Sequence, residues 1–326
     1  MIDRRTIVGA IAAGLVGAPR LIVAQAPPRV YRIGLLGVST AAGYARQAEA
    51  FRRGLSEHGY VEGHNVVIDQ RWADGDAARL PGLAAELVRL RPDVIVTSGP
   101  ATAVAKRATD TIPIVMTAGF DPAATGLVAS LARPGGNLPG ATIFVEELVA
   151  KRVQIVKEAL PRVARVGVLL GRGSPEGTTL RQAMDDASRQ VGVAVAPFEV
   201  RDTAEFGAAF AAMAGGGIGA LVVGDHTILV AEAARIAGLA NAQRLPSIGF
   251  VDFAAAGGLF AYGVDFPDLW HRAAETVDRI LKGAKPADMP IQRPTRFEFV
   301  VNLRTANTLG LAVPPTLLQR ADVVIR

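Results

Sequence analysis

The chain has 326 residues, of which 50% are hydrophobic, 20% are charged and 35 are glycine, as in soluble globular proteins, and this length predicts two lobes. It has no cysteine, which excludes disulfides, thiolate metal sites, a cysteine nucleophile and a cysteine-linked lipid anchor. The formal net charge is +5 and the pI is near 9.9, but no dense Lys/Arg cluster with interleaved aromatic residues is present, so nucleic acid is not an expected partner.

The first 26 residues are predicted to be an export signal. Arg4 and Arg5 precede a mostly apolar stretch at residues 6–19, and residues 24–26 (AQA) fit a cleavage site. The paired arginines resemble a twin-arginine signal, and a general secretory signal is the alternative. The apolar stretch is too short and too rich in glycine and alanine to span a membrane comfortably. We therefore expect the mature chain to begin near Pro27 and to work as a soluble periplasmic protein.

Strand-like apolar runs alternate with helix-like runs from Val30 onward. The run at residues 31–36 predicts a buried strand, and the helical spacing of Ala48, Phe51 and Leu55 predicts the helix that follows it. This regular alternation is typical of a parallel sheet that is covered by helices on both faces.

The order of these elements is repeated in the second half of the chain. Residues 29–34 (RVYRIG) are echoed by residues 162–167 (RVARVG), and the apolar run at 220–224 stands where residues 93–97 stood. Two copies of one unit predict an α/β protein of two similar doubly wound parallel-sheet lobes. The expected divisions are the export signal at 1–26, a first lobe at 27–144, a second lobe at 145–262, and a crossover and C-terminal segment shared between the lobes at 263–326.

Signatures of enzymatic chemistry are absent from the sequence. There is no nucleotide P-loop, no HExxH and no serine elbow, and the four histidines are scattered. The glycines of residues 171–177 (GRGSPEG) are spaced one residue too far apart for a dinucleotide loop, and Pro175 lies inside the turn. We therefore expect no catalytic residue, no cofactor and no metal.

A ligand is instead expected at the loops that follow the strands, because the carboxyl ends of parallel strands form the binding edge of such sheets. Ser98, Thr102 and the amides of the helix that begins beside them suit a carboxylate, and Thr117 is a further candidate donor. The alternative for Ser98 is a helix cap alone. The loops concerned lie at residues 38–45, 97–102, 117–122, 171–177, 224–227 and 250–253.

Acidic and aromatic residues near these loops complete the predicted site. Asp225, in the matching loop of the second lobe, is the candidate acceptor for an ammonium group, and Asp121 and Asp265 are weaker candidates. Asp121 before Pro122 is also explained as a turn residue. The candidate walls for an apolar side chain, each equally explained as core, are Tyr44, Phe120, Phe144, Tyr262 and Phe266.

Several stretches together resemble one family. These are TSGPATAVAKRATDTIPIVMTAGFDP, GLVASLARPGGNLPGAT, AKRVQIVKEALPRVARVGVLL, LFAYGVD and DRILKGAKPADMPIQRPTRFEFVVN, in order from about Val30 to the C-terminus. They are similar to the ABC transporter substrate-binding proteins of the family that includes tryptophan-binding lipoproteins. The resemblance implies a periplasmic binding protein of type I-like fold that closes on a small solute and delivers it to a membrane ABC permease. The better-known members bind aromatic amino acids.

The sequence departs from that family in two motifs. Relatives often carry a threonine between glycine and proline where this chain has Gly99-Pro100, so Ser98 or Thr102 would supply that hydroxyl. Relatives often read Ser-Tyr-Gly where this chain has alanine before Tyr262. These differences bear on the identity of the solute rather than on the fold.

The function predicted from the sequence is therefore an extracytoplasmic solute-binding component of an ABC importer. It would act as a monomer and bind an amino acid or a similar small carboxylate between lobes hinged near residues 142–147 and 262–266. One alternative is a periplasmic sensory protein that signals to a membrane receptor. The other is a two-domain α/β enzyme with a nucleotide cofactor, against which the export signal and the glycine spacing count.

Overall fold

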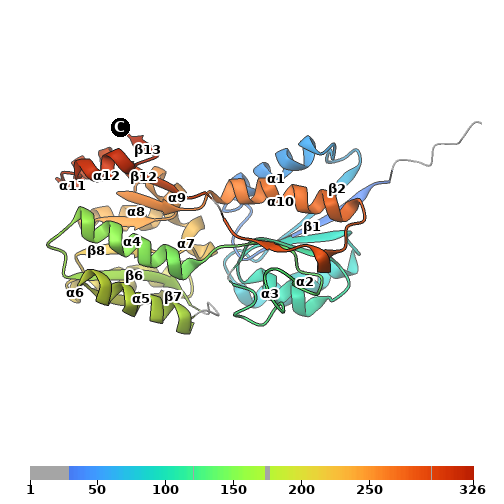
Figure 1. The fold of residues 1–326 in the computed structure, drawn as a ribbon, viewed down its shortest axis with the longest axis horizontal. Coiled ribbons are helices and arrows are strands. Elements are labelled where there is room, and N and C mark those ends of the chain that lie inside the picture. Colours follow the sequence, from blue (N-terminus) through green and yellow to red (C-terminus); the bar gives the residue numbers. More distant parts are fainter. Residues whose placement is uncertain (1–28, 120, 173–176, 295) are drawn as a thin grey trace, which may run out of the picture.

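A computed structural model describes residues 29–119, 121–172, 177–294 and 296–326. The predicted export signal and Phe120 lie outside these residues, as do residues 173–176 of the predicted loop at 171–177. Figure 1 shows two lobes that lie side by side along the long axis of the molecule, each with helices packed around a central sheet. The predicted two-lobed α/β architecture is confirmed.

The first lobe is built on a six-stranded sheet in the order β11-β5-β4-β3-β1-β2, and all of its described pairings are parallel. Its strands are β1 (Tyr31–Gly37), β2 (Val66–Trp72), β3 (Val94–Thr97), β4 (Ile114–Gly119), β5 (Gly140–Thr142) and β11 (Ile291–Gln292). Its α-helices are α1 (Ala45–Glu57), α2 (Leu80–Arg89), α3 (Ala101–Ala108) and α10 (Phe266–Leu281).

The second lobe is built on a seven-stranded sheet in the order β13-β12-β10-β9-β8-β6-β7, in which β10 and β12 pair antiparallel and the other described pairs are parallel. Its strands are β6 (Arg165–Gly171), β7 (Ala194–Val200), β8 (Ala220–Val223), β9 (Ser247–Gly249), β10 (Phe260–Gly263), β12 (Glu298–Asn302) and β13 (Val323–Ile325). Its α-helices are α4 (Val145–Ala159), α5 (Gly177–Val191), α6 (Phe206–Gly215), α7 (Thr227–Ala231), α8 (Ala233–Ala242), α9 (Val251–Ala255), α11 (Leu303–Leu309) and α12 (Pro315–Arg320).

The chain crosses between the lobes three times: between β5 and α4, between β10 and α10, and between β11 and β12. The second crossing returns α10 to the first lobe, where it lies alongside α1, more than 200 residues away in the sequence (Figure 1). The third crossing carries the C-terminal strands and helices back to the second lobe. Three segments of chain therefore connect the two lobes.

Alternation of side chains along the buried strands explains why the first sheet carries helices on both faces. Val94 and Val96 of β3 pack on the side of α1 and α10, whereas Ile95 packs on the side of α2 and α3. Successive side chains of a strand point to opposite faces, so a strand covered on both sides becomes a continuous apolar run. The sequence shows this pattern at β3 and in the apolar parts of β1 and β4. No helix among the described residues is both long and apolar enough to cross a bilayer.

The contact between α1 and α10 depends on a glycine. A Cβ atom at Gly54 would lie 2.4 Å from the carbonyl oxygen of His271 and 2.9 Å from Cβ of Ala274, so the two helix backbones approach too closely for any side chain. Gly54→Ala is therefore expected to lower the free energy of unfolding by about 1–3 kcal/mol, although alanine has the higher helix propensity. Urea denaturation measures this change.

Gly82 in α2 provides the matched control for this substitution. No atom lies within 4 Å of the Cβ position there, and the backbone is not left-handed. Gly82→Ala should therefore leave stability unchanged or raise it by up to about 1 kcal/mol. Equal stability of the two variants would contradict the close helix contact at Gly54.

Candidate ligand-binding site

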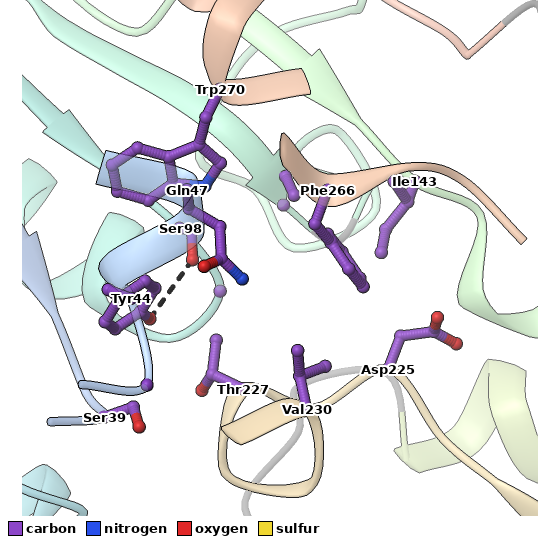
Figure 2. A pocket seen from close by; sticks show the side chains of 14 residues that line it. Ser39, Tyr44, Gln47, Ser98, Ile143, Asp225, Thr227, Val230, Phe266 and Trp270 are labelled. Carbon is purple, nitrogen blue, oxygen red and sulfur yellow. Dashed lines mark hydrogen bonds between the residues drawn. The ribbon is translucent and has the colours of Figure 1, made fainter. Parts of the chain in front are cut away.

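A cavity lies between the lobes at the carboxyl ends of both sheets, and the space between protein atoms there, its opening to solvent included, amounts to about 500 Å³. The first lobe lines it with residues that follow β1 and β3 and with the last two residues of β4: Ser39, Gly43, Tyr44, Gln47, Ser98, Gly99, Ala118 and Gly119. The second lobe and the crossing after β5 line it with Ile143, Asp225, Thr227 and Val230, and the first turns of α10 add Phe266 and Trp270. Figure 2 shows these side chains converging from both lobes.

The turn after β3 contributes a hydroxyl group to the cavity and leads into the N-terminal end of α3. Ser98 is nearly fully buried, and its Oγ lies 3.3 Å from the Tyr44 hydroxyl (Figure 2). Gly99 has φ +55, and its N–H donates to the carbonyl of Ala118, so the turn is fixed against the neighbouring strand before α3 begins. Burial raises the pKa of the Tyr44 phenol, which therefore stays neutral and able to donate a hydrogen bond.

Asp225 and Arg152 form a buried ion pair at the second-lobe side of the cavity. Nη1 of Arg152 lies 2.5 Å from Oδ2 of Asp225, Nη2 lies 2.8 Å from Oδ1, and neither side chain is accessible to solvent. Arg152 projects from α4 and also donates to the backbone carbonyls of Val223 and Tyr262. The charge of Asp225 is thus balanced within the lobe, while its carboxylate keeps acceptor positions beyond the two that Arg152 occupies.

Two candidate donors lie beside the cavity without lining it. The hydroxyl of Thr102 is hydrogen-bonded to that of Thr97 at 2.9 Å, and the hydroxyl of Thr117 donates to the carbonyl of Thr97 at 3.1 Å. Both side chains therefore hold the end of β3 in place. The carboxylate of Asp121 accepts from the amide of Ala123, as a turn residue does.

The remaining candidates are placed away from the cavity or at its edge. Asp265 caps α10 by accepting from the amide of Asp268, and it faces a separate surface hollow. Tyr262 stacks on Phe297, with ring centroids 6.0 Å apart. Phe144 lies under the guanidinium of Arg293, 3.6 Å from the ring centre. The structure therefore gathers Tyr44, Ser98, Asp225 and Phe266 of the predicted set around one cavity, and it places the other described candidates elsewhere.

Several lining residues are absent from the sequence-based set. Gln47 lies on the face of α1 that also carries Ala48 and Phe51, and a polar residue on an otherwise apolar helix face was the available signal. Trp270 lies on the buried face of α10 and has the pattern of a core residue. Thr227 stands at the end of a loop that the sequence did single out.

The lobes touch one another around the cavity. Nη1 of Arg46 in α1 lies 2.7 Å from Oδ1 of Asp252 in α9. A Cβ atom at Gly99 would lie 3.1 Å from Cγ2 of Thr227, and one at Gly43 would lie 3.0 Å from Cβ of Ala231. These contacts join the post-strand turns and α1 of the first lobe to α7 and α9 of the second, so the cavity is covered along this rim.

His226, beside the cavity, makes stability depend on pH. Its Nδ1 caps α7 by accepting from the amide of Ile228, its ring lies over Gly171, and burial lowers its pKa from 6.5 to about 4. Between these values the unfolded chain binds a proton that the folded chain does not, so stability falls as the pH drops below 6.5. We expect a loss of about 2–3 kcal/mol between pH 7 and pH 4.5 from this residue.

The measurement is the midpoint of urea denaturation as a function of pH. His226→Asn keeps a capping oxygen without a titrating ring, so it should flatten the decline between pH 6.5 and pH 4.5. His64→Asn changes an exposed turn residue and should leave the decline intact. A His226→Asn profile parallel to that of the unchanged protein would contradict the assignment.

The molecule has two lobes, each built on a mainly parallel sheet, and three segments of chain connect them. A covered cavity lies where the ends of the two sheets face each other. This arrangement is that of a two-lobed solute-binding protein. The family model described as ABC transporter substrate binding protein matches residues 37–325. The chain belongs to this family, whose members are extracytoplasmic solute-binding proteins rather than enzymes.

Individual relatives agree with this membership. A tyrosine-binding protein of Clostridioides difficile (strain R20291) is 27% identical over 265 residues, which cover 81% of this chain and 76% of the relative. A solved ABC domain from Streptococcus pneumonia in complex with L-Trp has a TM-score of 0.81 and 26% identity, and the match covers 90% of this chain and 100% of that one. A conserved domain protein from Vibrio cholerae has a TM-score of 0.84 and 25% identity over 91% of this chain and 100% of its own.

Proposed function

We propose that the chain is the extracytoplasmic solute-binding component of an ABC importer, and that it holds an amino acid between its lobes. The observation that carries this proposal is the covered cavity, which takes hydroxyl groups and a helix beginning from one lobe and a carboxylate from the other. The tyrosine-binding relative and the neighbour with bound L-Trp support an aromatic amino acid as the first ligand to test.

The ligand's carboxylate would rest at the beginning of α3. The Ser98 hydroxyl and the backbone N–H groups of this first turn are donors, and the helix dipole favours negative charge there. The ammonium would lie toward the second lobe, where Asp225 lines the cavity, and the side chain would pack against Phe266 and Trp270. A zwitterion thus meets a donor group on one lobe and an acceptor group on the other.

Contact with both lobes also accounts for capture and release. A ligand that bridges the lobes binds the closed arrangement more tightly than an open one, so it shifts the population toward closure. The contacts of Arg46 with Asp252 and of Gly99 with Thr227 would form on closure and separate on opening. A monomer that presents both lobes to a membrane permease completes the proposal, and an export signal would bring it to that place.

The experiment is a thermal-shift screen of the chain from Pro27 against the amino acids, benzoate and 4-hydroxybenzoate, followed by calorimetry of every hit. A ligand at 100 times its dissociation constant adds about 2.7 kcal/mol of stability, which raises the unfolding midpoint measurably. Binding of an aromatic amino acid with one site per chain is the expected result. Binding of the aromatic acids alone, without any amino acid, would overturn the assignment of Asp225 to an ammonium.

A further inference from the structure

Gln47 is a buried polar side chain without a partner in the protein. It lies in the first turn of α1, only 7% of its surface is exposed, and its amide points into the cavity (Figure 2). No hydrogen bond joins that amide to any of the described residues. The amide is therefore free to hydrogen-bond water or a ligand group that enters the cavity.

The surroundings of Gln47 give no structural reason for a polar residue. The same face of α1 carries Tyr44, Ala48 and Phe51, which are buried and pack against the first sheet. Leucine or methionine would fill this position without leaving an amide unpaired. The glutamine is therefore explained by what enters the cavity rather than by the packing of α1.

The indole of Trp270 lies in the same part of the cavity. Its ring packs against Tyr44, with centroids 5.6 Å apart, and edge-on to Phe51 at 6.3 Å, so its position is fixed. No hydrogen bond joins its N–H to the part of the chain that the structure describes. A ligand group that reaches this corner meets an aromatic wall, a neutral amide and an indole N–H.

The side chains at this corner of the cavity are uncharged, which suits a neutral ligand group. Among the described lining residues, Asp225 is the only Asp, Glu, Lys, Arg or His, and its side chain is paired with Arg152. Gln47 offers a donor and an acceptor without charge, which suits a phenol hydroxyl or a ring N–H. A ligand side chain that has neither a donor nor an acceptor leaves the amide of Gln47 unpaired. Sites of this kind discriminate strongly against analogues that lack the matching polar group.

We propose that Gln47 is a specificity-determining residue, whose amide hydrogen-bonds a neutral polar group on the aromatic side chain of the bound amino acid. The inference rests on the proposed function, because it assumes an amino acid in this cavity. It predicts that the protein prefers L-tyrosine or L-tryptophan to L-phenylalanine by about 10–100-fold.

The test compares the dissociation constants of these three amino acids by calorimetry for the unchanged chain, Gln47→Met and Gln319→Met. Methionine keeps the shape of glutamine without its amide, so Gln47→Met is expected to fold and to reduce the preference to about threefold or less. Gln319 lies exposed on α12, far from the cavity lining, and its replacement should change nothing.

Each contrary outcome has its own meaning. Equal loss of affinity for all three amino acids in Gln47→Met would show that Gln47 holds the amino-acid backbone, and it would overturn the inference while the proposed function stands. An unchanged preference, or equal binding of phenylalanine by the unchanged chain, would also overturn it. Failure of all three to bind would overturn the proposed function together with this inference.

Discussion

Replacing Arg152 with methionine is expected to lower the free energy of unfolding by about 3–5 kcal/mol, the largest effect on stability that the structure indicates. The substitution leaves the buried carboxylate of Asp225 without its bidentate partner, and it also removes donors to the carbonyls of Val223 and Tyr262. Those carbonyls end β8 and β10, where the second lobe meets the cavity. Urea denaturation with ligand absent measures the loss.

A double-mutant cycle separates the unpaired charge from the lost packing. Arg152→Met combined with Asp225→Leu removes both charges, so it should recover at least about 1.5 kcal/mol of the stability that Arg152→Met alone loses. Arg79→Met is the matched control, because Arg79 pairs with the exposed Asp74 and also donates to one backbone carbonyl. It should cost less than about 1 kcal/mol. A similar loss for Arg152→Met and Arg79→Met would contradict the structural role of the buried pair.

The fold could be predicted because its physical cause is local. The inner strands β1, β3 and β4 of the first sheet are covered on both faces, so each contains an apolar run, and the covering helices show apolar residues at helical spacing. Val94, Ile95 and Val96 illustrate this, since one run of three residues faces two separate helical layers. The repeat of these elements in order then predicts the second lobe.

The site could be predicted only as far as its loops. The rule that ligands lie beyond the carboxyl ends of parallel strands led to Ser98 and Asp225, which do line the cavity. The same rule led to Thr102, whose hydroxyl turns back to Thr97. Which of two neighbouring hydroxyls faces a cavity depends on the rotamer and on the partner it finds, and a sequence pattern specifies neither.

Partners from distant segments could not be predicted at all. Arg152 has the pattern of an ordinary charged residue on a helix, and its pairing with Asp225, 73 positions away, follows from how α4 packs beneath β8. Trp270 lines the cavity only because the second crossing returns α10 beside α1. The pairing of Arg152 and the position of Trp270 both depend on long-range packing, which the spacing of residues along the sequence does not indicate.

Val230→Trp is expected to lower the affinity for the amino-acid ligand more than 100-fold, the largest effect on binding among these predictions. Val230 projects from α7 toward the middle of the cavity (Figure 2), and it is only partly buried, so the larger side chain has room to fold with the lobe. An indole there would occupy the space that the ligand needs and would hold α7 away from the first lobe. Calorimetry with L-tyrosine and L-tryptophan measures the loss.

The control for this substitution is Val61→Trp, at an exposed loop position of the first lobe where the same side chain meets only solvent. Both variants should unfold within about 1 kcal/mol of the unchanged chain in the absence of ligand, because neither disturbs a fully buried core position. Lost binding with intact stability in Val230→Trp alone would require that the ligand lies between the lobes. Unchanged affinity in that variant would place the ligand outside this cavity, and the roles of Ser98, Asp225 and Gln47 in binding would fall together.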